Sequence, residues 1–418
     1  MRLFDVTIRR IIVGIGLALA ALLQTAAADE TEKGLGLSPP EAIGLLPSHL
    51  KYIDDAARAA IERSEIPGAV VLVARRGRIG YLKAFGSRAL QPVREPMTID
   101  TIFDIASLTK VIATTPSIML LVERGAVRLG DKVKRYLPQF TGGKKEEITV
   151  HQLLTHYSGL PPDFDLSKQW QGHEQALEQL WKEKTVSDPG KDFAYSDLNF
   201  ITLGEIVHAV SGRSLDTYAQ ERIFQPLGMS ETTFLPPASW KSRIAPTEPR
   251  SNTLQYLKGV GTPEQAEEIL RGEVHDPTAW RMGGIAGHAG LFSTARDLAI
   301  YVQMLLNDGS WMGQRLLSPL AVRAMTSPQN PPNSTSLRGF GWDIYTSYSS
   351  PRGDLFPDGY GHTGFTGSSV WVDPATKTFV ILLSNRVHPD GKGDVTHLRG
   401  VIANIVAASI NDAAATKP

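Results

Sequence analysis

Apolar and β-branched residues gather near both ends of the chain, in runs whose length and composition predict strands. The stretch AVVLVARRGRIGYLKAFG, residues 69–86, carries two such runs around Arg76-Gly77-Arg78, which is the pattern of a β-hairpin. The strand pattern returns after residue 335 in GFGWDIYT and in GSSVWVDPATKTFVILLSN, where Asp373-Pro374 predicts a second hairpin turn. We therefore expect one antiparallel sheet that draws strands from both ends of the chain.

Helical periodicity dominates between these two blocks. Apolar residues recur at helical spacing through most of 145–310, and the last residues of two such runs precede Gly212 and Gly309. The sequence predicts an α/β (α+β) fold, in which an antiparallel sheet flanked by helices lies beside a mostly helical second region. We expect one domain over 46–412. Its sheet region covers about 46–106 and 311–412, and its helical region covers about 107–310.

The N-terminus has the pattern of a secretory signal peptide over residues 1–28. Arginines come first, the apolar run Ile11 to Leu23 follows, and Ala26-Ala27-Ala28 offers a small-residue cleavage site. The run is shorter than the roughly 20 residues of a spanning helix. We expect cleavage, a periplasmic or secreted protein and no stable membrane span afterwards. Residues 29–45 read as a linker and 413–418 as a tail.

Composition narrows the function further. The 418 residues include 43 Lys plus Arg and 43 Asp plus Glu, and this balance gives no electrostatic footprint for nucleic acid. The chain has no cysteine, which excludes disulfides, thiolate nucleophiles and iron–sulfur clusters. The histidines lack spacings such as H-E-x-x-H, so we expect no metal and no cofactor.

The first candidate for chemistry is DIASLTKVIAT, where Ser107 and Lys110 are three residues apart at the start of a predicted helix. Positions i and i+3 share a helix face, so the hydroxyl and the amine can meet. A neighbouring base can turn a serine into a nucleophile. Short S-x-x-K motifs also occur by chance. Pro116 lies inside the same helix and is expected to kink it or cut it in two.

Two further stretches supply groups that an acyl-transfer site needs. DFAYSDLNF carries Tyr195 and Asp197, which point the same way if the segment is extended or a turn. GYGHTGFTGSSVWV carries His362, Thr363 and Gly364 at the start of a strand. A strand edge entered through glycine offers free N–H groups, and one of them can pair with the Ser107 N–H as an oxyanion donor.

These three elements, in this order, resemble the penicillin-recognising serine hydrolases. The family includes class C β-lactamases, DD-peptidases and related esterases, and the resemblance covers about residues 50–410. It implies a β-lactamase/DD-peptidase-like catalytic domain, an acyl-enzyme on the serine and a proton-relay lysine and tyrosine. Carried over, the roles fall on these positions: Ser107 as nucleophile, Lys110 as base or relay, Tyr195 as proton shuttle, His362-Thr363-Gly364 as the substrate-binding strand and Phe365 as the second oxyanion N–H.

Two positions depart from the family pattern. Asp197 stands where Asn is usual, and an ionised Asp offers acceptors only. Such a carboxylate beside Lys110 is expected to raise the lysine pKa and to favour proton abstraction through Tyr195. His362 stands where many members have Lys, and His is mostly neutral at pH 7 unless a neighbour raises its pKa.

A third stretch, EVHDPTAWRMGGIAGHAGLFST, combines glycines with two histidines and suggests a loop that closes on a substrate. We expect His275 and Asp276 to orient one another and Arg281 to offer charge to an anionic substrate. An ordered structural loop is the alternative. The substrate expected from the whole pattern is a D-Ala-D-Ala-like peptide, so the chain reads as a DD-carboxypeptidase-like or β-lactamase-related enzyme. An esterase, or a β-lactam or peptidoglycan binding protein without turnover, remains the alternative.

Overall fold

The computed structural model describes residues 35–254 and 268–412, so the predicted signal segment and tail lie outside the described residues. Its centre is an eight-stranded antiparallel sheet with strand order β3-β2-β1-β13-β12-β11-β10-β9. The strands are β1 (Gly68–Arg75), β2 (Arg78–Ala89), β3 (Glu95–Pro96), β9 (Leu337–Arg338), β10 (Asp343–Tyr345), β11 (Tyr360–Thr363), β12 (Ser369–Asp373) and β13 (Thr378–Ser384). Both predicted hairpins are present, and β1 pairs with β13, which confirms a sheet built from both ends of the chain.

Strand β1 shows why its sequence is a continuous apolar run. Val70 and Leu72 face one hydrophobic core, whereas Val71 and Val73 face another. Alternate side chains of a strand point to opposite faces, so a strand covered on both sides must be apolar at every position. The sheet is therefore a layer between two cores, not a surface with one wet face.

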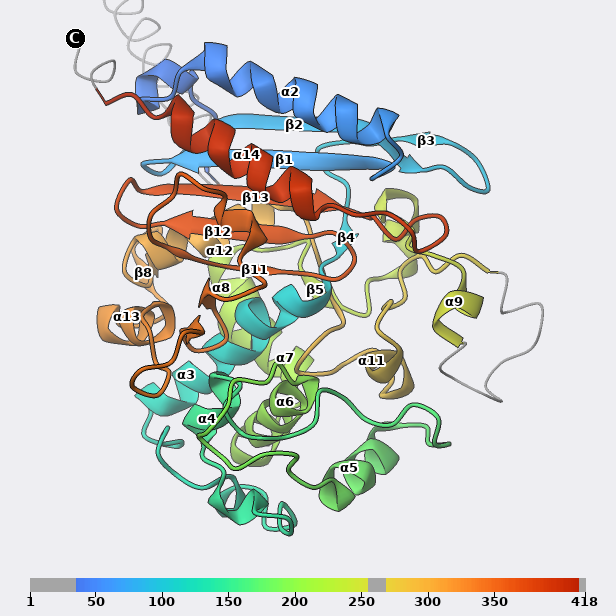
Figure 1. Ribbon diagram of the computed structural model, residues 1–418, viewed down its shortest axis with the longest axis vertical. Coiled ribbons are helices and arrows are strands. Elements are labelled where there is room, and N and C mark those ends of the chain that lie inside the picture. Colours follow the sequence, from blue (N-terminus) through green and yellow to red (C-terminus); the bar gives the residue numbers. More distant parts are fainter. Residues whose placement is uncertain (1–34, 255–267, 413–418) are drawn as a thin grey trace, which may run out of the picture.

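Helices cover the two faces unequally (Figure 1). The first and last long helices, α2 (Pro47–Glu62) and α14 (Thr396–Ser409), lie side by side on one face. Helix α12 (Ala295–Leu306) packs on the other face, against β1 and β13. The remaining helices lie beyond it: α3 (Thr115–Glu123), α4 (Val150–Leu154), α5 (His173–Lys182), α6 (Asp197–Ser211), α7 (Leu215–Ala219), α8 (Gln225–Leu227), α9 (Arg250–Leu254), α11 (Pro277–Arg281) and α13 (Pro319–Thr326).

A second, three-stranded sheet takes two of its strands, β5 (Thr233–Phe234) and β6 (Leu291–Ser293), from the part of the chain expected to be helical. It joins them to β4 (Phe103–Asp104) in the order β4-β6-β5, while β7 (Ser310–Trp311) and β8 (Gln314–Arg315) form a separate small hairpin. Strands of two or three residues leave no periodicity in a sequence, so the pattern did not predict them. The small sheet matters because β4 ends immediately before Ser107.

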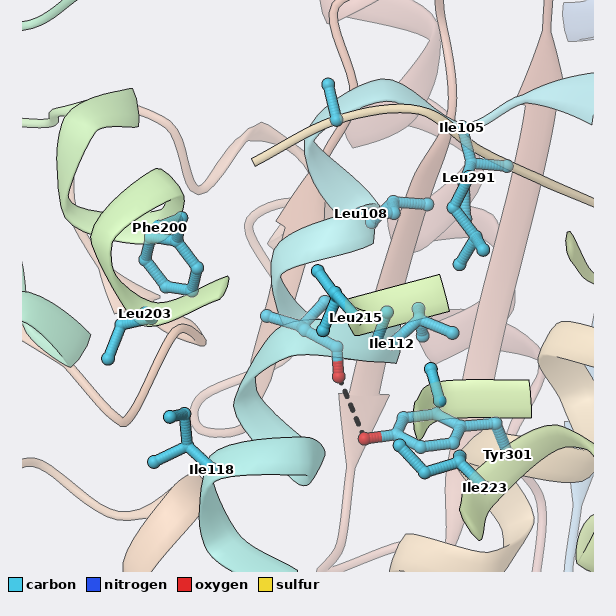
Figure 2. Close-up of a cluster of buried hydrophobic side chains, with 14 of the residues drawn as sticks. Ile105, Leu108, Ile112, Ile118, Phe200, Leu203, Leu215, Ile223, Leu291 and Tyr301 are labelled. Atoms are coloured by element: carbon cyan, nitrogen blue, oxygen red, sulfur yellow. Dashed lines mark hydrogen bonds between the residues drawn. The ribbon is translucent and has the colours of Figure 1, made fainter. Parts of the chain in front are cut away.

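Pro116 does not cut the helix that follows Ser107, so that part of the expectation is wrong. A turn of 3₁₀ helix, Ala106–Leu108, continues through a π turn, Lys110–Thr114, into α3. In a π turn the Val111 carbonyl would accept from the N–H five residues on, which Pro116 lacks. The Tyr301 hydroxyl donates to that carbonyl instead, at 2.8 Å (Figure 2). A distant tyrosine thus satisfies the acceptor that proline leaves unpaired.

The described end of the predicted linker differs from a free tether. Leu35 and Leu45 are buried, and Leu37 forms a bridge with Ile79 of β2. Leu45 forms another with Ile410, just after α14. The apolar residues of this segment are therefore part of the fold.

Candidate active site

Ser107 lies in the tight 3₁₀ turn that connects β4 to the π turn. The residue before it, Ala106, has a left-handed backbone with φ of 46°, a conformation that is uncommon for a residue with a side chain. Asp104 holds this turn, because its Oδ1 accepts from the Ala106 N–H at 2.8 Å and its Oδ2 from the His275 N–H at 2.7 Å. Burial raises the pKa of this carboxyl, and the two backbone donors oppose the rise. Sequence reasoning missed Asp104, although it precedes the serine by only three residues.

Lys110 lies behind Ser107 and has no exposed surface. Its Nζ is 3.0 Å from Ser107 Oγ, 3.0 Å from the His288 carbonyl and 2.7 Å from Asp197 Oδ1. Burial alone lowers the pKa of this amine, but the charge of Asp197, helped by Tyr195, outweighs it and leaves the pKa raised. The direction agrees with the expectation from sequence. Lys110 is therefore an ammonium ion at neutral pH.

Tyr195 and Asp197 enter the site from one segment, as the sequence predicts. Asp197 is the first residue of α6, and the Tyr195 ring lies 5.1 Å from Lys110 Nζ. The ring of His156 stacks on Tyr195 with centroids 4.4 Å apart, and its Nδ1 accepts from the Ser196 N–H. Burial lowers the pKa of His156 well below its usual value, so it packs as a neutral imidazole. Sequence reasoning did not assign His156 a role.

His362 and Thr363 end β11 beside this group. Burial, followed by the charges of Arg338 and Lys110, lowers the pKa of His362 well below its usual value, so it supplies no cation. Gly364 allows close packing, because a Cβ there would meet the Ser368 hydroxyl at 2.1 Å and the Ile105 carbonyl at 2.5 Å. The strand end is thereby drawn against the segment that carries Ser107.

Phe365 lies at the mouth of the site, with 61% of its surface exposed. Its ring stacks on His275 with centroids 5.5 Å apart, and the Arg386 guanidinium lies 4.4 Å from the ring centroid. Within the described residues, neither the Phe365 N–H nor the Ser107 N–H donates to a protein acceptor. An oxyanion hole requires backbone donors that are free to bind the developing charge, and both of these N–H groups are free.

Two cavities meet at Ser107, and Phe365 lines both. One has a volume of about 460 Å³, and its lining includes the polar side chains of Glu248, Asn252, His275, Asp276, Asp390 and Lys392. The other is smaller, about 170 Å³, and is lined by Tyr195, Arg338, Asp343, Tyr348, His362 and Thr363. Arg338 was not anticipated from the sequence. Its buried guanidinium lies 3.5 Å from Asp343 and donates to the Gly341 carbonyl at 2.6 Å.

The glycine-rich loop corrects two expectations. His275 and Asp276 do not orient one another: His275 Nε2 pairs with Glu248 at 2.5 Å, and Asp276 Oδ1 pairs with His288 Nε2 at 2.8 Å. Arg281 offers no charge to a substrate, because it is buried and donates to the carbonyls of Leu166 and Lys168. The side chains of His275 and Asp276 point to different partners because Asp276 accepts from the Ala279 N–H as the N-cap of α11, which turns it away from His275.

The Beta-lactamase family model matches residues 53–403, which is most of the chain. The chain belongs to the β-lactamase family. A relative from Salmonella enteritidis PT4, provisionally named D-alanyl-D-alanine carboxypeptidase, is 31% identical over 381 residues, which cover 85% of this chain and 86% of the relative. The family and its relatives identify the protein as a serine hydrolase.

Solved structures share the β-lactamase fold at lower identity. An octameric penicillin-binding protein homologue from Pyrococcus abyssi superposes with a TM-score of 0.66 at 24% identity, over 86% of this chain and 78% of that one. A class C β-lactamase from Rhodobacter sphaeroides gives 0.63 at 22% identity, over 85% and 97% of the two chains. The fold class expected from the sequence is confirmed.

Among the residues that the structure describes, one helix, Ala106–Glu123, is long and apolar enough to cross a membrane by length and composition. It is the helix that carries Lys110, and 78% of its apolar window is buried inside the fold. A buried helix at the centre of a soluble core passes the same test. Its apolar character therefore reflects packing on both sides, which Figure 2 shows with α6 residues on one side and Tyr301 on the other.

Two groups of side chains in the described residues place possible metal ligands within 4.8 Å of one another. His173, Glu205 and His208 form one group, along α6 and at the start of α5. The other joins Asp197, Asp276 and His288, beside Lys110. In the second group each carboxylate already pairs with a cation, Lys110 or His288, so we assign this group as ion pairs.

Proposed function

We propose that this β-lactamase-family hydrolase forms an acyl-enzyme on Ser107 and acts as a DD-carboxypeptidase on peptides that end in D-Ala-D-Ala. The observation that supports this most directly is the contact of the Lys110 ammonium with both Ser107 Oγ and Asp197, at the junction of two unequal cavities. The name of the relatives that match most of the chain points to the same substrate class.

Acylation begins with loss of the Ser107 proton. Lys110 is not a free base, because Asp197 stabilises its charged form. Tyr195, acting as a phenolate beside the Lys110 ammonium, takes the serine proton to become a phenol. The phenol then gives that proton to the leaving amine and becomes a phenolate again, while the ammonium stabilises the negative charge beside it. As Ser107 Oγ attacks, the carbonyl oxygen gains charge between the N–H groups of Ser107 and Phe365.

The two cavities assign the two halves of the substrate. The leaving group must lie beside Tyr195 to receive the proton, and the cavity there, of about 170 Å³, accommodates a residue the size of alanine. Neutral His362 supplies no cation for a terminal carboxylate, whereas Arg338 is the guanidinium among the residues lining this cavity. The acyl part of the peptide takes the larger cavity, which Phe365 also lines. Water then attacks the acyl-enzyme to release the shortened peptide.

The proposed substrate also bears on where the protein works and what it binds. A substrate in peptidoglycan agrees with a periplasmic or secreted protein released by cleavage after the predicted signal peptide. The partner is a small-molecule or peptide substrate, and the balanced charge gives no reason to expect nucleic acid.

A three-substrate assay tests the function. A peptide ending in D-Ala-D-Ala, nitrocefin and a short-chain p-nitrophenyl ester are compared by kcat/KM, with the acylated peptide mapped by mass spectrometry. We expect free D-Ala, the highest kcat/KM for the peptide and label on Ser107 alone, lost in Ser107→Ala. A higher value for the ester or nitrocefin would make the protein an esterase or a β-lactamase. Stable labelling without any turnover would make it a binding protein.

A further inference from the structure

A second ion pair, Asp276–His288, lies against Lys110 and has no role in the steps above. His288 is buried, whereas Asp276 is partly exposed in the wall of the larger cavity. The side chain of His288 is 1% exposed and its Nε2 lies 2.8 Å from Asp276 Oδ1. The main-chain carbonyl of the same histidine accepts from Lys110 Nζ at 3.0 Å. His288 thus links the pair to Lys110 through its own backbone.

Lys110 depends on that carbonyl. Its three N–H bonds meet three acceptors, from Ser107, Asp197 and His288, and each acceptor comes from a different segment of the chain. A lysine ammonium has three donors. Removing one acceptor would let the ammonium turn away from the line between Ser107 and Asp197.

The backbone next to His288 is fixed by unusually close packing on α6. A Cβ on Gly287 would lie 1.8 Å from the Phe200 carbonyl, so only glycine fits there. The Thr114 hydroxyl donates to the Gly287 carbonyl at 2.6 Å, which ties the loop to the helix of Lys110. The Gly287–His288 part of the glycine-rich loop therefore packs against the segment that carries Lys110, whereas His275 and Asp276 of the same loop line the larger cavity.

Several elements contribute titratable groups around the pair. The titratable groups that face Lys110 and His288 are Asp197 and Tyr195 at the start of α6, Asp276 at the start of α11, Asp163 between α4 and α5, and the neutral imidazoles of His156 and His362. Two cations face two carboxylates. Burial, with Asp197 and Asp276 nearby, raises the pKa of Asp163 to about 7, so this third carboxyl is partly protonated at neutral pH.

We propose that Asp276–His288 is a positioning pair: it fixes the His288 carbonyl that orients Lys110, and its imidazolium cancels the charge of Asp276 next to Asp197. Neither residue touches the reacting atoms. The pair acts through Lys110, and the inference rests on the proposed acyl-enzyme function for its kinetic test.

Charge cancellation predicts a specific pattern in the pH dependence of acylation. In His288→Gln the charge of Asp276 is left uncompensated, which favours protonation of every neighbouring group. We expect the pH–rate profile to move upward by about one unit, the lower end of the range for an adjacent charge. In Asp276→Asn the buried imidazole loses its counter-ion and gives up its proton, so both charges disappear and the profile moves little. The double variant Asp276→Asn/His288→Gln should return the profile towards wild type.

The experiment measures the pH dependence of acylation by stopped-flow fluorescence with a fluorescent penicillin. Thermal unfolding of each variant reports folding, and His388→Gln is the matched control, since His388 is a buried histidine that bonds to Leu90 and Thr247 instead. The control should lower stability without moving the profile. An unshifted profile in His288→Gln, or a double variant shifted as far as His288→Gln, would reduce the pair to ordinary packing and overturn the proposal.

An independent readout separates this proposal from the proposed function. In ¹⁵N-histidine-labelled protein we expect His288 to stay protonated at a pH where His156 and His362 are neutral, and to lose its proton in Asp276→Asn. A neutral His288 in wild type would refute the charge pair even if the enzyme acylates normally. Absence of acylation in wild type, with a protonated His288, would refute the proposed function alone.

Discussion

Two lysines of the described chain are fully buried, and burial has opposite outcomes for them. Lys110 lies in the active site against Asp197, and its pKa is raised. Lys145 lies in the helical region, where its Nζ donates to the carbonyls of Leu180 and Trp181 at 2.9 and 2.8 Å. Burial lowers the pKa of Lys145 to about 8, and two nearby glutamates offset only part of that effect.

The difference teaches which partner keeps a buried amine charged. The carbonyl groups at the end of α5 accept hydrogen bonds from Lys145, but they do not offset the free-energy cost of removing its charge from water. For Lys110, the carboxylate of Asp197 is in direct contact and offsets this cost. The more basic of the two lysines therefore lies beside the nucleophile, which argues that Lys110 works as a fixed cation, and Lys145 caps a helix.

The largest expected effect is on the acylation rate, and it should distinguish Lys110 from Lys145. Lys110→Ala is expected to slow acylation of Ser107 by about 10²-fold or more, because the relay loses its cation. Lys145→Ala removes an equally buried lysine and should lower the unfolding temperature while leaving the acylation rate of folded protein nearly unchanged. Stopped-flow acylation and thermal unfolding, measured on both variants, check this. Equal kinetic losses would show that burial, not position, makes Lys110 important.

Tyr195→Phe is expected to have an effect of similar size, about 10²-fold or more, because the phenol is the proposed proton carrier. Since the two residues act as a unit, the double variant Lys110→Ala/Tyr195→Phe should be little worse than the poorer single variant. The check is kcat/KM for the same acylating substrate in the three proteins. Near-wild-type activity in Tyr195→Phe would mean that this ring serves only to pack on His156.

A smaller effect, on substrate preference, is expected when Lys110 loses its carboxylate partner and so resembles Lys145. Asp197→Asn removes the carboxylate that keeps Lys110 charged and adds a donor for a substrate carbonyl. We expect the ratio of kcat/KM for nitrocefin to that for a p-nitrophenyl ester to rise several-fold. His362→Lys should move the ratio the same way by adding a cation. If both variants keep the wild-type ratio, these positions do not set specificity.

The smallest effect concerns stability alone. The folded-state pKa of Lys145, about 8, lies below the unfolded value of about 10.4, so between these pH values the unfolded chain binds more protons. Stability contributed by this group therefore rises with pH across that window, by at most about 1.4 kcal/mol per pH unit. Lys110, whose pKa is raised, contributes stability that is lost only above about pH 10.4.

Urea unfolding of Lys145→Met from pH 7.5 to 10 should lack the rise seen in wild type. The neighbour Lys144, which is exposed and paired with Asp188, is the control, and Lys144→Met should keep the rise. An unchanged slope in Lys145→Met would place the pKa of Lys145 near its ordinary value.

Much of the fold could be predicted because its signals are local. The hairpins β1–β2 and β12–β13 are β-branched runs around turn residues, and β1 is apolar throughout because both faces are covered. The Ser107–Lys110 contact follows from i,i+3 spacing, which any helical turn brings together. Tyr195 and His362 follow this pair in the same order as the matching motifs of the penicillin-recognising serine hydrolases, so their roles could be predicted by resemblance. For these features the interacting residues lie close together in the sequence, or the periodicity of apolar residues shows which face is buried.

The tertiary structure decided the features whose partners are far apart in the chain. Asp276 faces His288 and not its neighbour His275, because capping α11 turns its side chain away. Asp104 and Arg338 reach the site from short strands that leave no periodic signal. The lowered pKa of Lys145 also belongs to this class, because its carbonyl partners Leu180 and Trp181 lie far away in the chain. The raised pKa of Lys110, in contrast, could be expected once Asp197 was placed beside it.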